Sequence, residues 1–163
     1  MKTRRVVFAG GTVIIAVLLG TGLTLLPADT DNHAVTVTVA DISELVLAGG
    51  NITLTINSVT GGTPDSAVNT DCSLSWTCNG ASKKITAATD LVSPDYTLTL
   101  SATSVIGGTA GSVITLDSTT AGDLVTGITA GTGSCTLQYT ASALLTEAIG
   151  SVVHTVTLTI TSV

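Results

Sequence analysis

Apolar and hydroxyl-bearing residues alternate along most of the chain beyond residue 33. Between His33 and Val39 every second residue is apolar, and threonines occupy the positions between Val35, Val37 and Val39. Alternation with a period of two is the pattern of a β-strand with one buried face. The alternation recurs, in full or in part, at residues 52–56, 74–77, 96–100, 113–116, 135–140 and 153–160.

Glycine, asparagine, proline and aspartate stand between these runs, for example at Asn79-Gly80 and Ser93-Pro94-Asp95. Such residues favour turns, and eight or nine strands at this spacing are typical of an antiparallel sandwich or a small barrel. We therefore predict that residues 35–163 form one all-β domain, a single antiparallel β-sandwich of the immunoglobulin-like type. Only residues 141–149 could form a helical turn or two.

The N-terminal segment predicts export. Lys2, Arg4 and Arg5 precede an almost unbroken apolar run from Val6 to Leu26, which is the order of a secretory signal. Residues 1–28 are expected to be a signal peptide cleaved after Ala28, or a membrane anchor helix if they are retained. Residues 29–34 then form a linker, and the domain is extracytoplasmic in either case.

Composition and charge narrow the functions. The chain has 163 residues, of which 44% are hydrophobic but only 2% aromatic, so the core must be aliphatic. Trp76 is expected to be the one large ring of this core and not a platform on which a sugar stacks. The chain has eleven acidic and five basic residues, and three of the basic residues lie in the first five positions. This charge excludes a nucleic-acid partner, and membrane contact is expected only through the N-terminal segment.

Three cysteines, Cys72, Cys78 and Cys135, lie in the exported part, where disulfides persist. If residues 72–78 form one strand, Cys72 and Cys78 are about 20 Å apart, too far for a disulfide unless residues 71–73 turn back. Either cysteine could then pair with Cys135. Under an immunoglobulin-like strand order, which places the two strands on opposite sheets, Cys72–Cys135 is the better pair.

No motif for a nucleophile, a phosphate loop or a metal site is present, so we predict no enzymatic activity, no cofactor and no metal. His33 and His154 are expected to be solvated. Asp41 with Glu44, or Asp117 with Asp123, could approach each other, but such pairs arise by chance on an acidic surface. The lysines at positions 83 and 84 are expected to protect an exposed sheet edge.

Residues 76–87, 122–128 and 154–160 resemble strand–turn–strand signatures of small secreted bacterial proteins. In general pattern, residues 35–163 resemble the spore-coat-U type of β-sandwich, a class that includes subunits of chaperone–usher pili. This resemblance implies a coat or fibre subunit that donates an N-terminal strand to a neighbour. Val35, Val37, Val39 and Ile42 supply an alternating apolar segment for strand addition. The same segment could instead be the first strand of a self-contained sandwich.

Two classes of function follow. The first is an exported structural protein, a coat, fimbrial or filament subunit that self-associates through strand addition. The second is a secreted module that binds a carbohydrate or a surface partner through loops around Asp65, Asp95 or Asp123. Those loops contain few aromatic or arginine anchors, which favours the structural class.

Overall fold

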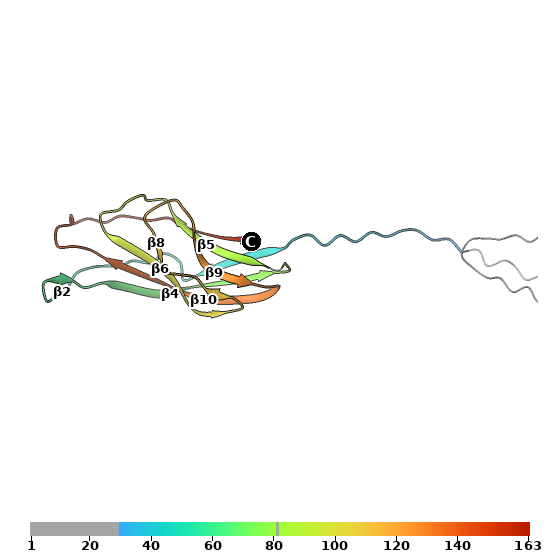
Figure 1. The fold of residues 1–163 in the computed structure, drawn as a ribbon, viewed down its shortest axis with the longest axis horizontal. Helices are drawn as coiled ribbons and strands as arrows, with labels where there is room; N and C mark the ends of the chain where they lie inside the picture. The colour runs from blue at the N-terminus through green and yellow to red at the C-terminus, as the bar shows by residue number, and fades with distance from the viewer. Residues whose placement is uncertain (1–29, 81) are drawn as a thin grey trace, which may run out of the picture. The chain divides into compact units, whose positions relative to one another are not determined.

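The computed structural model describes residues 30–80 and 82–163. The predicted signal peptide or anchor, residues 1–28, lies outside the described residues. Contacts divide the chain into two units, Met1–Val37 and Thr38–Val163. All the strands of the described residues lie in the second unit (Figure 1).

The described residues form β-strands and no helix, which confirms the all-β prediction. Accordingly, this part of the chain holds no long apolar helix that could span a membrane. The strands are β1 (Ser43–Ala48), β2 (Val59–Thr60), β3 (Thr63–Pro64), β4 (Ala67–Cys78), β5 (Lys83–Thr89), β6 (Thr97–Ile106), β7 (Thr109–Ala110), β8 (Ile114–Thr115), β9 (Gly122–Ile128), β10 (Gly131–Ser142) and β11 (Val156–Ser162).

The strands pair into two larger sheets and one small hairpin, and every pairing is antiparallel. The first sheet has the order β1-β4-β10-β6-β8, and the second has the order β11-β5-β9-β7. β2 and β3 form the separate hairpin. The two strands of 12 residues, β4 and β10, lie side by side inside the first sheet.

The core draws its buried side chains from both larger sheets. Leu74 and Leu137 come from the first sheet, Ile85 and Leu124 come from the second, and all four have at most 1% of their surface exposed. Trp76 is also buried, as predicted from its being the only tryptophan. The core is therefore aliphatic around one large ring.

The Trp76 ring lies against the neighbouring strand where that strand has no side chain. Gly133 is the register partner of Trp76, and a Cβ atom on this glycine would lie 2.3 Å from Cε2 of the indole ring. Glycine is thus required here for close approach. This requirement explains Gly133, the second glycine of Gly131-Thr132-Gly133, although the composition of these three residues is typical of a turn.

The predicted strands at 74–77, 96–100, 113–116, 135–140 and 153–160 each overlap an observed strand. Two predicted strands differ. Residues 33–39 are exposed and form no strand, and residues 52–56 alternate between exposed and half-buried positions without belonging to a ladder. The first strand of the fold is instead Ser43–Ala48. No helix forms at 141–149: β10 continues to Ser142, and beyond it a single turn closes with a hydrogen bond from the Glu147 N–H to the Leu144 carbonyl.

The prediction that the two lysines protect an exposed edge is wrong. They open β5, which lies between β11 and β9 and is an inner strand. Lys83 is only 2% exposed. The order of strands in a sheet depends on pairings distant in sequence, which a local pattern does not contain.

Candidate assembly site

The apolar segment that precedes the first strand is exposed to solvent. Val35, Val37 and Val39 have 73%, 80% and 77% of their surface accessible, and Ile42 has 59%. None of these residues belongs to a strand. The segment therefore combines an alternating apolar face with a backbone that is not in any sheet.

Asn79, in the turn between β4 and β5, holds the end of this segment. Its side-chain Oδ1 accepts a hydrogen bond from the Ile42 N–H at 2.8 Å, and its Nδ2 donates to the Ala40 carbonyl at 2.8 Å. The Asn79 N–H also donates to the Ile42 carbonyl at 3.2 Å. One asparagine thus acts as a strand partner for residues 40–42, immediately before β1 begins.

A buried lysine reinforces the same point. Lys83 Nζ lies 2.7 Å from the Asp41 carboxylate, and the lysine side chain is 3% exposed while that of Asp41 is 58% exposed. Nζ also lies 3.4 Å from the Ser162 hydroxyl in β11. A buried ammonium needs such partners, because an unpaired charge away from water is strongly unfavourable. Gly80 leaves the required space, since a Cβ there would lie 3.1 Å from both Asp41 Oδ1 and Lys83 Cε.

We call this arrangement of Asp41, Asn79 and Lys83 the anchor. It lines a shallow open depression with Val39 and Ser162. Sequence reasoning missed both Asn79 and Lys83. The Asn79-Gly80 pair predicted only a turn, whereas the asparagine also binds a segment 37 to 39 residues away. Ile42 was predicted as part of the strand to be donated, but its N–H and carbonyl are both held by Asn79.

The three cysteines are free and buried, so the predicted Cys72–Cys135 disulfide is not formed. The assumption of opposite sheets is wrong: the two residues lie on neighbouring strands of one sheet, with Cys135 opposite Leu74 and Cys72 opposite Leu137. Such diagonal neighbours are about 7–8 Å apart, beyond the reach of an unstrained disulfide. Cys72 and Cys78 both lie in β4, as the single-strand assumption required.

His154 is not the solvated residue that the sequence predicted. Its Nδ1 lies 2.9 Å from the Thr89 hydroxyl and its Nε2 lies 2.6 Å from the Tyr96 hydroxyl. Partial burial lowers the pKa of His154, which Asp90 opposes electrostatically. This histidine therefore links the segment before β11 to the end of β5 and to the loop before β6. His33 is exposed, as predicted.

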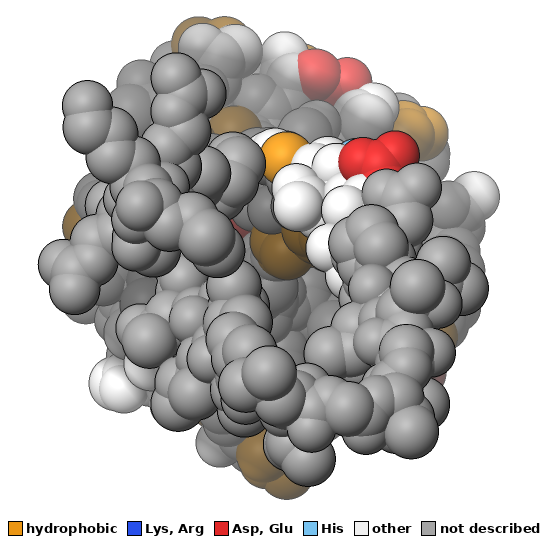
Figure 2. All heavy atoms as spheres, turned by 90° about the vertical axis from the view of Figure 1, so that its right-hand side faces the viewer, with side chains coloured by type: hydrophobic (Ala, Val, Ile, Leu, Met, Phe, Trp, Pro, Cys, Tyr) orange, Lys and Arg blue, Asp and Glu red, His pale blue; other side chains and the backbone are white. Residues whose placement is uncertain are grey.

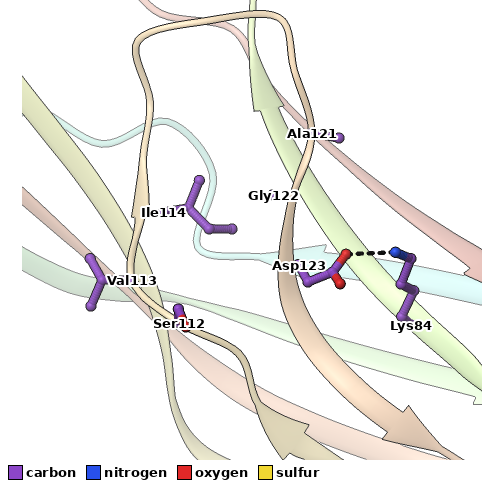
Figure 3. Close-up of a pocket in the computed structure, with 7 residues that line it drawn as sticks. All are labelled: Lys84, Ser112, Val113, Ile114, Ala121, Gly122 and Asp123. Carbon is purple, nitrogen blue, oxygen red and sulfur yellow. Dashed lines mark ion pairs between the residues drawn. The ribbon is translucent and has the colours of Figure 1, made fainter.

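One carboxylate from each pair considered, Asp41 and Asp123, forms an ion pair with a lysine. Asp123 in β9 forms an ion pair with Lys84 at 2.8 Å, beside an open depression lined also by Ser112, Val113 and Ile114 (Figure 3). Among the described residues, no group of three or more histidine, cysteine or acidic side chains is placed to hold a metal ion. The Asp65 loop is tied locally, because the Asp65 N–H donates to the Ser58 carbonyl at 2.9 Å.

The described surface also carries scattered apolar side chains. Figure 2 shows carboxylates and apolar groups exposed on the same face. The loop between β10 and β11 exposes Leu144, Leu145, Ile149 and Val153.

Comparison with known proteins adds no assignment: no family model, no curated protein and no solved structure matches the chain.

Proposed function

We propose that this protein is an exported structural subunit, whose two larger sheets stack as an immunoglobulin-like sandwich and whose N-terminal segment adds as a strand to a neighbouring copy. The observation that carries the proposal is the exposure of Val35, Val37 and Val39, which are 73% to 80% accessible at every second position. An alternating apolar segment outside any sheet is what strand addition requires, because main-chain bonds supply affinity and alternate side chains fill pockets.

The anchor supports this role. It fixes residues 40–42 through side-chain bonds from Asn79 and the ion pair of Lys83. A donated segment needs a fixed attachment to its own domain, because a flexible linker would give the neighbouring subunit no defined orientation. The donated part is then residues 35–39, and Ile42 belongs to residues 40–42, which the anchor fixes.

The energetics set a requirement on the acceptor. Complete burial of three valine side chains contributes roughly 4.5–9 kcal/mol. Ordering the backbone of five residues costs about 5–10 kcal/mol. Side-chain burial alone therefore only offsets the ordering, and ladder hydrogen bonds must supply the remainder. The acceptor must offer apolar pockets and unpaired backbone groups together.

The protein has no catalytic role in this proposal. Asp41 and Asp123, one carboxylate from each pair considered, form ion pairs with Lys83 and Lys84. These contacts pair each carboxylate with a cation, and the pair of Lys84 with Asp123 links β5 to β9. The acidic, threonine-rich exterior suits a protein that functions by assembly outside the cytoplasm.

A pair of matched variants tests the proposal. Val37→Asp places a charge on the apolar face of the segment, and Thr36→Asp places the same charge on the alternate face. The full-length chain and both variants are expressed in an exporting host, and assembly is measured by sedimentation velocity and negative-stain microscopy. We expect wild type and Thr36→Asp to form fibres or oligomers and Val37→Asp to remain monomeric. Assembly of Val37→Asp at the wild-type level would refute strand donation.

A further inference from the structure

One side of the core is incompletely covered. Nine apolar residues pack against the core while remaining half-buried, and seven of them lie in three segments: β1, residues 51–57 and β11. None of these segments contributes a fully buried residue. We call the three segments together the seam. Its half-buried apolar residues are Leu45, Ile52, Leu54, Ile56, Val156, Leu158 and Ile160.

The seam lies where both larger sheets end. β1 is the edge strand of the first sheet and pairs only with β4, and β11 is the edge strand of the second and pairs only with β5. The two edge strands are close neighbours, but no ladder joins them. The opposite side of the molecule is closed more completely, because Ile114 and Leu116 at that edge are buried.

Residues 51–57 have the form of a strand without the partners of one. Ile52, Leu54 and Ile56 face the core at every second position, and the residues between them are exposed. No backbone hydrogen bond outside the strands joins 51–57 to another described residue. Extended backbone with unpaired N–H and carbonyl groups is a template for an added strand.

The direction of the strands places this template away from the anchor. β1 begins opposite Cys78, next to the turn that holds Asn79, and runs away from that turn to Ala48. Residues 51–57 follow β1. β11 runs in the opposite direction and ends opposite Lys83. One copy therefore has its anchor at one end of the seam and its unpaired residues toward the other.

We propose that the seam, and residues 51–57 in particular, is the acceptor for residues 35–39 of a second copy; this inference rests on the proposed function. The two segments match: Val35, Val37 and Val39 offer three apolar side chains at a spacing of two, and residues 52–56 repeat that spacing beside unpaired backbone groups. Donor and acceptor are different surfaces of one chain, so the contact is heterologous and propagates from copy to copy.

Hydrogen exchange tests the acceptor directly. Amides of residues 51–57 are expected to exchange at least tenfold more slowly in assembled wild type than in monomeric Val37→Asp, with slower exchange also along β11. The amides of β8, at the opposite edge, serve as the internal control and are expected to exchange equally in both. Protection that appears around β8 and not at 51–57 would overturn the assignment of the acceptor.

A complementation experiment provides a second readout. Leu54→Asp alters a seam residue and keeps the donor, while Thr53→Asp is its control on the exposed face of the same segment. We expect Leu54→Asp alone to be monomeric and Thr53→Asp to assemble. Mixing Leu54→Asp with Val37→Asp should give only 1:1 dimers, because one variant can donate and the other can accept. Circular dichroism and Trp76 fluorescence verify that each variant is folded.

The outcomes separate the two proposals. If Val37→Asp is monomeric while folded Leu54→Asp assembles, donation stands and the acceptor lies elsewhere. If Val37→Asp assembles, or if wild type never assembles, donation itself fails and the acceptor assignment fails with it. The exchange measurement uses no seam variant, so it decides the question even if Leu54→Asp does not fold.

Discussion

Replacing Asn79 by alanine should loosen the start of β1. The change removes two side-chain hydrogen bonds, to Ile42 N–H and to the Ala40 carbonyl, both 2.8 Å long. Each such bond contributes about 0.5–1.5 kcal/mol net. The free energy for local opening of residues 40–44 should therefore fall by about 1–3 kcal/mol. Native-state hydrogen exchange of the Ile42 amide is expected to accelerate about 5- to 150-fold.

Asn69→Ala is the matched control. Asn69 also makes two hydrogen bonds with its side-chain amide, but both go to Asp71, two residues away. Its loss removes no contact between distant segments, so β1 should keep its protection in this variant. Equal acceleration of β1 exchange in both variants, or none in Asn79→Ala, would refute the idea that Asn79 fixes residues 40–42.

Three further predictions concern the core and its titrating groups. Gly133→Ala should destabilise the fold by about 1–3 kcal/mol, because the added Cβ would lie 2.3 Å from the Trp76 ring. Gly150→Ala is the control, because a Cβ there meets nothing within 4 Å, and it should be neutral. Denaturant titrations followed by tryptophan fluorescence measure both. Burial lowers the pKa of His154 in the fold. The free energy of unfolding of wild type should therefore decline as the pH falls below about 6.5. Unfolding curves for His154→Gln between pH 5 and 7.5 should lack this decline. All three cysteines are buried, and burial raises the pKa of Cys135 to about 11. A thiol reagent at pH 8 should therefore find no accessible cysteine in the native protein and three in denaturant. A single thiol in denaturant would show that a disulfide forms.

The sequence predicts β4, β6 and β10 well because their period-two pattern reflects burial on a single face. β4, β6 and β10 each extend a predicted run, and Trp76 is buried as expected. β1 escapes prediction because its apolar residues are consecutive: Leu45 is half-buried, while Val46 and Leu47 are exposed. Local periodicity marks a strand where alternate residues are covered, completely as in β4 or partly as in β11.

The candidate site was only partly predictable for a related reason. The segment Val35–Val39 is visible in the sequence as an apolar alternation, but that alternation cannot tell whether its partner lies in the same chain. The anchor depends on pairings across 37 to 42 residues, between Asn79 or Lys83 and residues 40–42. The roles of Lys83 and His154 likewise depend on which strands are neighbours, so a reading based on local polarity placed both in solvent.

The geometry of β1 has a mechanical consequence. All six of its residues are in register with β4, from Ser43 opposite Cys78 to Ala48 opposite Ser73. Antiparallel ladder bonds lie perpendicular to the strands, so tension applied along the axis of β1 through residues 38–42 would load the whole ladder in shear. The bonds would then share the force and break together, whereas a pull across the strand would peel them apart one by one.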